Sequence, residues 1–157
     1  MVPTTPEEFR RILGRFATGI TVVTSHALGG SHGMTATSFT SVSLEPPLVL
    51  VCVDKTANTH DVLLNGERFL VNILASRSDH RDTCINFAGK TKDWSLASWT
   101  DTPWGPKIDQ AVAVLGCRKT KSWPEGDHTI FIGRVEALGG SPGEPLVYYN
   151  RDFWRIS

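Results

Sequence analysis

Six of the nine side chains from Thr35 to Ser43 carry a hydroxyl group, and the apolar run Leu48–Val53 follows shortly afterwards. A strand with hydroxyls on both faces builds a poor core, because a buried hydroxyl without a hydrogen-bond partner costs about 1–3 kcal/mol. We therefore expect this segment to bind a flat, polar ligand rather than to fill the interior of the protein.

The next polar segment, Asp54–Thr59, combines a lysine with side chains that can cap a helix. Backbone amides at a helix start and a nearby cation together form an anion site. The alternative is that Asn58 or Thr59 only caps a helix and that Lys55 is solvated, and this segment alone supports both interpretations equally. Its position directly after the two preceding segments favours phosphate binding.

Other catalytic patterns are weak in this chain. Gly139–Gly143 matches the Gly-x-Ser-x-Gly pattern of serine hydrolases, but Pro142 removes the backbone N–H that an oxyanion hole needs. The five histidines and three cysteines lack the paired spacing of metal ligands, so no zinc site is predicted. No Gly-x-Gly-x-x-Gly or Walker-type loop occurs, and the five tryptophans lack the interleaved arginines of a nucleic-acid surface.

The length of the chain predicts one domain, 1–157. Its charge predicts no attraction to polyanions. The 157 residues include 16 basic and 16 acidic side chains, which predicts no steering toward nucleic acid or an anionic membrane. The N-terminus lacks a signal pattern, and no apolar stretch approaches the roughly 20 residues of a membrane helix, so a cytoplasmic protein is expected. The odd number of cysteines favours free thiols at Cys52, Cys84 and Cys117.

Three short helices are expected. Thr5 caps the first, whose apolar side chains at helical spacing are Phe9, Ile12, Leu13 and Phe16. The second runs from a cap at residues 58–59 to residue 64, with a left-handed stop at 65–66. The third runs from a Ser78 cap to Phe87.

Short β-strands account for most of the remaining chain. Apolar and β-branched runs predict strands at 20–25, 48–53, 69–74, 111–117, 128–138 and 146–149, besides the hydroxyl-rich segment. Ser122–Asp127 is turn-prone, and Gly89–Lys107 is predicted as a long loop anchored by tryptophans. Many short strands and few helices favour a closed or nearly closed antiparallel barrel, so the expected fold class is mainly β with short helices.

Four segments match one protein family in their order along the chain. They are Phe9–Thr24, Thr37–Leu48, the Gly-Asp-His sequence at 126–128, and the closing Pro145–Phe153. Together they resemble the short-chain flavin reductases of two-component monooxygenases. The resemblance implies an FMN-binding split β-barrel of antiparallel Greek-key type, usually a homodimer, that binds FMN or FAD and oxidises NADH or NADPH.

The resemblance also implies a set of flavin-binding residues. In the family, the strand matching 34–41 presents polar groups to the flavin ring, and the segment matching 53–59 holds the ribityl chain and phosphate. A basic side chain often reaches the phosphate from the segment matching 86–92, where Asn86 stands in place of an arginine and Lys90 or Lys92 is the candidate. The implied flavin-binding residues are Thr35, Ala36, Thr37, Ser38, Ser41, Asp54, Lys55, Asn58, Thr59 and Lys92.

The nicotinamide side is implied in the same way. Gly126, Asp127 and His128 match the family motif near the nicotinamide, where glycine permits close approach and His128 orients or stacks against the reduced ring. His128 is therefore the catalytic candidate, although a histidine at a strand start is often purely structural. Tyr149 and Arg151 match positions near the pyridine nucleotide.

The implied activity is hydride transfer from NADH or NADPH to FMN or FAD, with reduced flavin supplied to a partner monooxygenase. A non-catalytic flavin-binding protein and a pyridoxamine-phosphate-oxidase-like enzyme are the alternatives, although no basic cluster for the phosphate of an amine substrate is found. The absence of an arginine cluster for a 2′-phosphate favours NADH. The choice between FMN and FAD stays open.

Overall fold

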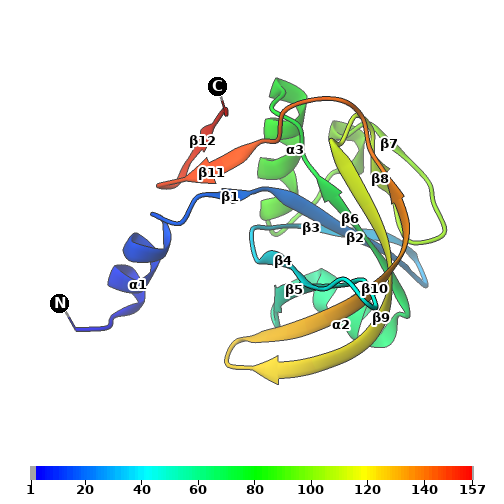
Figure 1. Ribbon diagram of the computed structural model, residues 1–157, viewed down its shortest axis with the longest axis horizontal. Coiled ribbons are helices and arrows are strands. Elements are labelled where there is room, and N and C mark those ends of the chain that lie inside the picture. The colour runs from blue at the N-terminus through cyan, green and yellow to red at the C-terminus, as the bar shows by residue number, and fades with distance from the viewer. Residues whose placement is uncertain (1–2, 157) are drawn as a thin grey trace.

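A seven-stranded antiparallel sheet in the order β3-β2-β6-β9-β10-β5-β4 organises the chain (Figure 1). The computed structural model describes residues 3–156. The strands of this sheet are β2 (Thr21–Ala27), β3 (Gly30–Ala36), β4 (Phe39–Ser43), β5 (Leu48–Asp54), β6 (Arg68–Ile73), β9 (Ala113–Glu125) and β10 (His128–Gly139).

The sheet is rolled, because strands from both ends of its order pack into one core. Val23 and Ala36 on β2 and β3 belong to the same buried cluster as Val51 and Val53 on β5. The helix α2 (Asn58–Asn65) adds Leu63 to this cluster. The edge strands β3 and β4 are not hydrogen-bonded neighbours, so the barrel has an open seam between them. This arrangement is the split barrel that the sequence predicts.

A second core lies between the sheet and the helix α3 (Ser78–Ala88), where Cys84 and Phe87 pack with Ile20, Val22 and Leu146. A small three-stranded sheet borders this core and consists of β1 (Thr18–Gly19), β11 (Val147–Tyr149) and β12 (Asp152–Trp154). The cysteines at 52, 84 and 117 are free thiols, as predicted. Among residues 3–156, no helix has the length and apolar character needed to span a membrane.

The predicted long loop is anchored by aromatic side chains, and it contains short elements that the sequence did not indicate. These are the turn of 3-10 helix η1 (Trp94–Leu96) and the hairpin of β7 (Trp99–Thr100) with β8 (Lys107–Ile108). The Trp94 ring packs edge-to-face against Phe87 at 4.7 Å and against Trp99 at 5.3 Å. The loop is therefore attached to α3 beside the seam.

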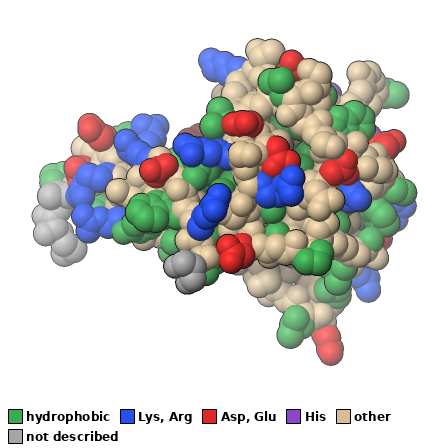
Figure 2. Space-filling model, turned by 90° about the horizontal axis from the view of Figure 1, so that it is seen from above, with side chains coloured by type: hydrophobic (Ala, Val, Ile, Leu, Met, Phe, Trp, Pro, Cys, Tyr) green, Lys and Arg blue, Asp and Glu red, His purple; other side chains and the backbone are tan. Residues whose placement is uncertain are grey.

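The first helix, α1 (Pro6–Leu13), forms where it was predicted, and the Thr5 hydroxyl accepts a hydrogen bond from the Glu8 N–H at 3.2 Å. The helix projects from the body of the protein (Figure 1), and none of its residues is buried. Seen from above, hydrophobic and basic side chains lie next to one another at this projecting end (Figure 2). Its apolar face therefore has no partner within the described part of the chain.

The predicted ends of the other helices were partly wrong. The helices α2 and α3 start at Asn58 and Ser78 themselves, after Ala57 and Arg77, and no side chain caps either start. Gly66, which follows α2, has φ −79° and is not left-handed. A Cβ at Gly66 would lie 2.7 Å from the Val62 carbonyl oxygen, so close approach, rather than backbone conformation, accounts for glycine there.

The turn predicted at 122–127 was also wrong, because β9 continues to Glu125 and only Gly126 and Asp127 form the turn to β10. Beyond Lys119, whose N–H still donates to the Glu67 carbonyl at 2.8 Å, β9 pairs with β10 alone and has a free edge. Proline is tolerated at such an edge because no further strand needs its missing N–H. Pro124 therefore does not end the strand, and the β9–β10 ribbon extends past the sheet.

Candidate functional site

The hydroxyl-rich segment crosses the seam of the barrel instead of forming one strand. Strand β3 ends at Ala36 on one edge of the sheet, and β4 begins at Phe39 on the other edge. Thr37 and Ser38 form the crossing and are exposed. The expectation of a single strand was therefore wrong, and the break places the hydroxyl groups at the opening of the barrel.

Several hydroxyls of this segment are already hydrogen-bonded within the protein. Thr35 Oγ1 donates to the Cys84 carbonyl at 2.7 Å, and Ser38 Oγ donates to the Cys52 carbonyl at 2.8 Å. The Ala36 side chain is buried, and its carbonyl accepts from Thr21 Oγ1 at 2.8 Å. A ligand at the seam would therefore meet oriented hydroxyl oxygens and backbone. Ser41, further along β4, is exposed.

A cleft of about 450 Å³ lies between β3, the start of α2 and the end of α3. Its walls include four of the residues that the resemblance singled out, namely Thr35, Asp54, Asn58 and Lys92. Burial lowers the pKa of the Lys92 ammonium. Thr59 is buried and lines an adjoining cleft. Of the residues predicted to hold the ribityl chain and phosphate, Asp54, Asn58, Thr59 and Lys92 thus lie around these two adjoining clefts.

The segment that precedes α2 is fixed by its own side chains. Asp54 Oδ1 accepts from both the backbone N–H and the hydroxyl of Thr56, each at 2.7 Å, and these bonds lower the pKa of the Asp54 carboxyl. Lys55 does not line the cleft. Its Nζ donates instead to the Gly126 carbonyl at 2.7 Å, and its backbone N–H donates to the Asp127 carbonyl at 3.0 Å.

The Gly-Asp-His sequence forms the tip of the β9–β10 ribbon. Gly126 has φ +56°, a conformation that favours glycine, and therefore makes the two-residue turn possible. His128 is the cross-strand partner of Asp54, so β5 brings this tip next to the phosphate segment. The His128 Nδ1 lies 2.7 Å from Asp127 Oδ1, a hydrogen bond that lowers the pKa of the Asp127 carboxyl.

The geometry of this pair leaves one ring nitrogen of His128 available. With Asp127 accepting from Nδ1–H, the imidazole is held in one orientation. The Nε2 atom has no hydrogen-bond partner among residues 3–156. The His128 side chain is 42% exposed, so a ligand can reach it.

A groove of about 520 Å³ lies on the other side of the seam, between α1 and the barrel. Thr37 and Ser38 line it together with Arg151. Tyr149, the other predicted residue near the C-terminus, packs edge-on against Trp154 at 6.1 Å, and Tyr148 lines the groove in its place. Alternation along β11 puts these two tyrosines on opposite faces, but the sequence does not say which face meets the groove.

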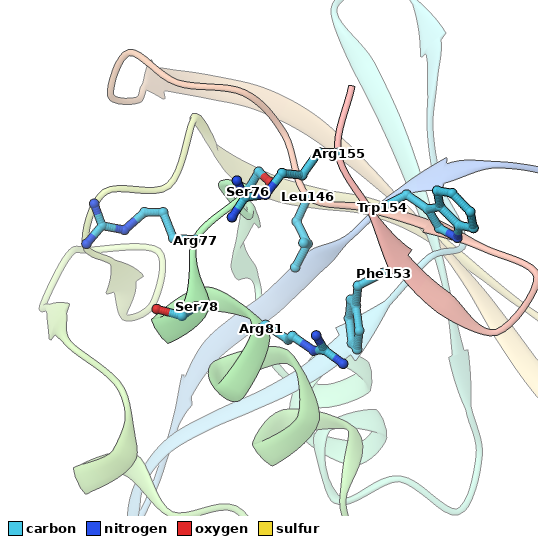
Figure 3. A pocket seen from close by; sticks show the side chains of 8 residues that line it. All are labelled: Ser76, Arg77, Ser78, Arg81, Leu146, Phe153, Trp154 and Arg155. Atoms are coloured by element: carbon cyan, nitrogen blue, oxygen red, sulfur yellow. The ribbon is translucent and has the colours of Figure 1, made fainter. Parts of the chain in front are cut away.

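A hollow that the sequence analysis did not indicate lies at the start of α3 (Figure 3). It measures about 190 Å³ and contains three arginines, but Figure 3 shows the Arg77 side chain pointing away from it. Arg77 pairs with Asp79 at 2.9 Å, and the Arg81 guanidinium lies 4.8 Å from the centre of the Phe153 ring. None of the predicted site residues lines this hollow.

These features define a class of protein: a split antiparallel barrel with nucleotide-sized clefts on both sides of its seam. Residues 13–157 match the family model described as the flavin reductase like domain. The chain therefore belongs to the flavin reductase-like family. The fold class and the family expected from the sequence are both confirmed.

Named relatives agree with this assignment. An "NADH-dependent flavin reductase" of Rhodococcus sp. is 38% identical over 95% of this chain and 85% of its own length. The "4-hydroxyphenylacetate 3-monooxygenase, reductase component" of Thermus thermophilus is 38% identical over 96% of both chains. The predicted enzyme class, a flavin reductase of the kind that serves monooxygenases, is confirmed by these relatives.

A solved structure gives the same result in three dimensions. The NADH:FAD oxidoreductase SgcE6 of Streptomyces globisporus, in complex with NAD and FAD fragments, superposes with a TM-score of 0.90. It is 36% identical, and the match covers 100% of this chain and 98% of that chain.

Proposed function

We propose that this protein transfers hydride from NADH to a flavin bound along β3 and supplies the reduced flavin to a separate monooxygenase. The observation that carries this proposal is the juxtaposition of the cleft with the His128 tip, which the pairing of Asp54 with His128 brings about. This juxtaposition supports a flavin phosphate bound beside the nicotinamide.

We propose that the flavin ring lies at the seam against Thr35–Ser38 and Ser41, with the ribityl chain and phosphate in the cleft near Asp54, Asn58 and Lys92. The donor set fits such a group. Thr35 and Ser38 are oriented by their own hydrogen bonds, and Lys92 is a partly buried cation at the far end of the cleft. Thr59 extends this wall toward the adjoining cleft.

On the nicotinamide side, Asp127 holds the His128 imidazole, and Gly126 leaves room for the ring because it has no side chain. Arg151 lines the α1 groove, and we propose that it binds a phosphate of the pyridine nucleotide; Tyr149 borders the same turn. When both nucleotides are bound, their own chemistry supplies the hydride transfer from the nicotinamide to the flavin. The protein needs no strong acid or base, since alignment alone contributes on the order of 7–11 kcal/mol.

The test is the His128→Ala variant with His26→Ala as a matched control. His26 lies at the end of β2 and contacts the Thr102 carbonyl at 2.9 Å, away from the cleft. We expect NADH-dependent flavin reduction to fall about tenfold in His128→Ala, the equivalent of about 1.4 kcal/mol, while flavin affinity is unchanged. Unchanged turnover would remove His128 from the mechanism. A protein that binds flavin but never bleaches it with NADH would instead be the non-catalytic alternative.

We also propose a homodimer. The apolar face of α1 has no partner among residues 3–156, and Phe9 on α1 and Phe16 just after it are 58% and 72% exposed. A second copy can cover this face and the groove beside it, and closed symmetric pairs are the commonest assemblies of soluble proteins. Sedimentation velocity at several concentrations measures the state directly, and a monomer at every concentration would contradict the proposal. The cytoplasmic location expected from the sequence stays a prediction.

A further inference from the structure

His60 is a buried, titratable side chain that lines neither of the two adjoining clefts. It lies in the first turn of α2, directly after Thr59. Its Nε2 lies 2.8 Å from the hydroxyl oxygen of Thr129 on β10, and its Nδ1 lies 3.0 Å from Asp61 Oδ1. Both ring nitrogens are therefore engaged. Thr129 is also buried, so its hydrogen bond with His60 is shielded from water.

These two contacts fix the direction of the hydrogen bonds made by the neutral ring. The Asp61 carboxylate is exposed and can only accept, so the proton lies on His60 Nδ1. Nε2 is then the acceptor, and the Thr129 hydroxyl donates to it. The imidazole also packs edge-to-face against Phe131, two residues further along β10, with ring centres 5.9 Å apart. His60 therefore holds the start of α2 at a defined place on β10.

The contact between His60 and Thr129 joins the two sides of the proposed site. The helix α2 begins with Asn58 and Thr59, which line the clefts, whereas Thr129 directly follows His128. Because side chains alternate along a strand, Thr129 points into the core toward His60, and His128 points to the opposite face. Within residues 3–156, no other hydrogen bond connects α2 with β10. A shift of Thr129 would therefore move His128 relative to α2.

The Asp54 carboxyl shows that both imidazoles belong to one neighbourhood. The hydrogen bonds from Thr56 lower the pKa of this carboxyl most, and charge on His128 and on His60 lowers it further. Both rings therefore lie within electrostatic range of the same group. Only His128 is accessible to a ligand, since its side chain is 42% exposed and His60 is buried. Replacing His60 or Thr129 thus removes no contact with a ligand in either cleft.

We propose that His60 is a positioning residue for hydride transfer, because through Thr129 it sets the place of His128 relative to the start of α2. This inference rests on the proposed function, since it assumes that α2 holds the flavin and that His128 meets the nicotinamide. The far end of α2 is held separately: Lys119 Nζ donates to the Leu63 carbonyl at 2.8 Å and also to the next carbonyl. Lys119 therefore provides a control on the same helix, away from its start.

The experiment uses Thr129→Val and His60→Leu, which each remove the hydrogen bond and keep the approximate size of the side chain. We expect kcat for NADH-dependent flavin reduction to fall about fivefold in both, with the KM for NADH and the flavin affinity changed less than about twofold. The double variant should lose no more kcat than the larger single loss, because both changes remove one contact. His60→Gln, whose amide can reach Thr129, should restore most of kcat. Lys119→Met should lower stability in urea and leave kcat unchanged.

A measurement on the protein without nucleotides checks the positioning directly. In isotope-labelled protein followed by NMR, the ring resonances of His128 should shift in Thr129→Val and His60→Leu and stay in place in Lys119→Met. Thr129→Val, the smaller change, decides the question if His60→Leu does not fold.

The possible outcomes separate this inference from the proposed function. If both variants lose stability but keep kcat and the His128 resonances of the wild type, His60 is only structural, and the inference is overturned while the reductase activity stands. A loss of kcat in His60→Leu without one in Thr129→Val would also overturn it, because the effect would not pass through Thr129. A wild-type protein that does not reduce flavin with NADH would refute the proposed function and this inference together.

Discussion

Replacing Lys55 with methionine tests how the two halves of the site are held together. Lys55 contacts the ribbon tip twice, through its backbone N–H to Asp127 and through its Nζ to the Gly126 carbonyl at 2.7 Å. The substitution removes only the second contact and keeps an unbranched side chain, one heavy atom shorter. We expect the tip that carries His128 to become less well positioned, while the cleft walls stay in place.

The expected magnitude follows from that one hydrogen bond. An exposed hydrogen bond of this kind contributes about 1 kcal/mol, which corresponds to about a fivefold change in an equilibrium constant. We therefore expect kcat/KM for NADH to fall about fivefold and the free energy of unfolding to fall by about 1 kcal/mol or less. Flavin affinity should change less than about twofold, because Lys55 does not line the cleft.

Three measurements on the same preparation check this reasoning: steady-state oxidation of NADH at saturating flavin, flavin titration by fluorescence, and urea unfolding. Lys121→Met is the matched control, because Lys121 lies on β9 in the ribbon that carries the tip, and its ammonium lies 5.5 Å from the centre of the Trp123 ring. If Lys55→Met weakens flavin binding tenfold and leaves the KM for NADH unchanged, Lys55 contacts the flavin phosphate itself and the reasoning above is refuted.

Two further predictions concern the core. Gly133→Ala should destabilise the fold by about 1–3 kcal/mol in urea unfolding, because a Cβ there would lie 2.5 Å from Phe69 Cζ, whereas Gly19→Ala, with nothing within 4 Å, should cost far less. Burial raises the pKa of the Cys117 thiol from 9.0 to about 12, so the unfolded chain releases this proton at lower pH than the folded one. Stability should therefore fall as the pH rises from 9 toward 12, and Cys117→Ala should show a smaller decline; identical profiles would contradict the assignment.

The strands of the barrel could be predicted from sequence because their signals are local. Apolar runs such as 48–53 and 69–74 correspond closely to β5 and β6. The end of β9 could not be predicted, since Pro124 breaks a strand only where a second neighbour needs its N–H, and sequence does not show where β6 stops. Strand β12 was missed because its turn depends on left-handed conformations at both Asn150 and Arg151, and an arginine seldom adopts this conformation.

The residues of the site could largely be predicted from the sequence, but their arrangement in space could not. The sequence identified the hydroxyl-rich segment, yet only the tertiary structure places a break at Thr37 and Ser38 and moves the chain from one sheet edge to the other. The contact of Lys55 with Gly126 joins residues 71 positions apart, and nothing in the local pattern indicates it. Lys92 was found through the resemblance alone, because a lysine in a loop is usually solvated.

The seam at Thr37 and Ser38 has a consequence for turnover. Strands β3 and β4 are not hydrogen-bonded to each other there. A flat molecule can therefore enter and leave without breaking main-chain hydrogen bonds or exposing the core. Such an opening suits a ligand that binds, is reduced and dissociates in every catalytic cycle. A fully closed barrel of the same composition would have to open each time before the ligand could enter or leave.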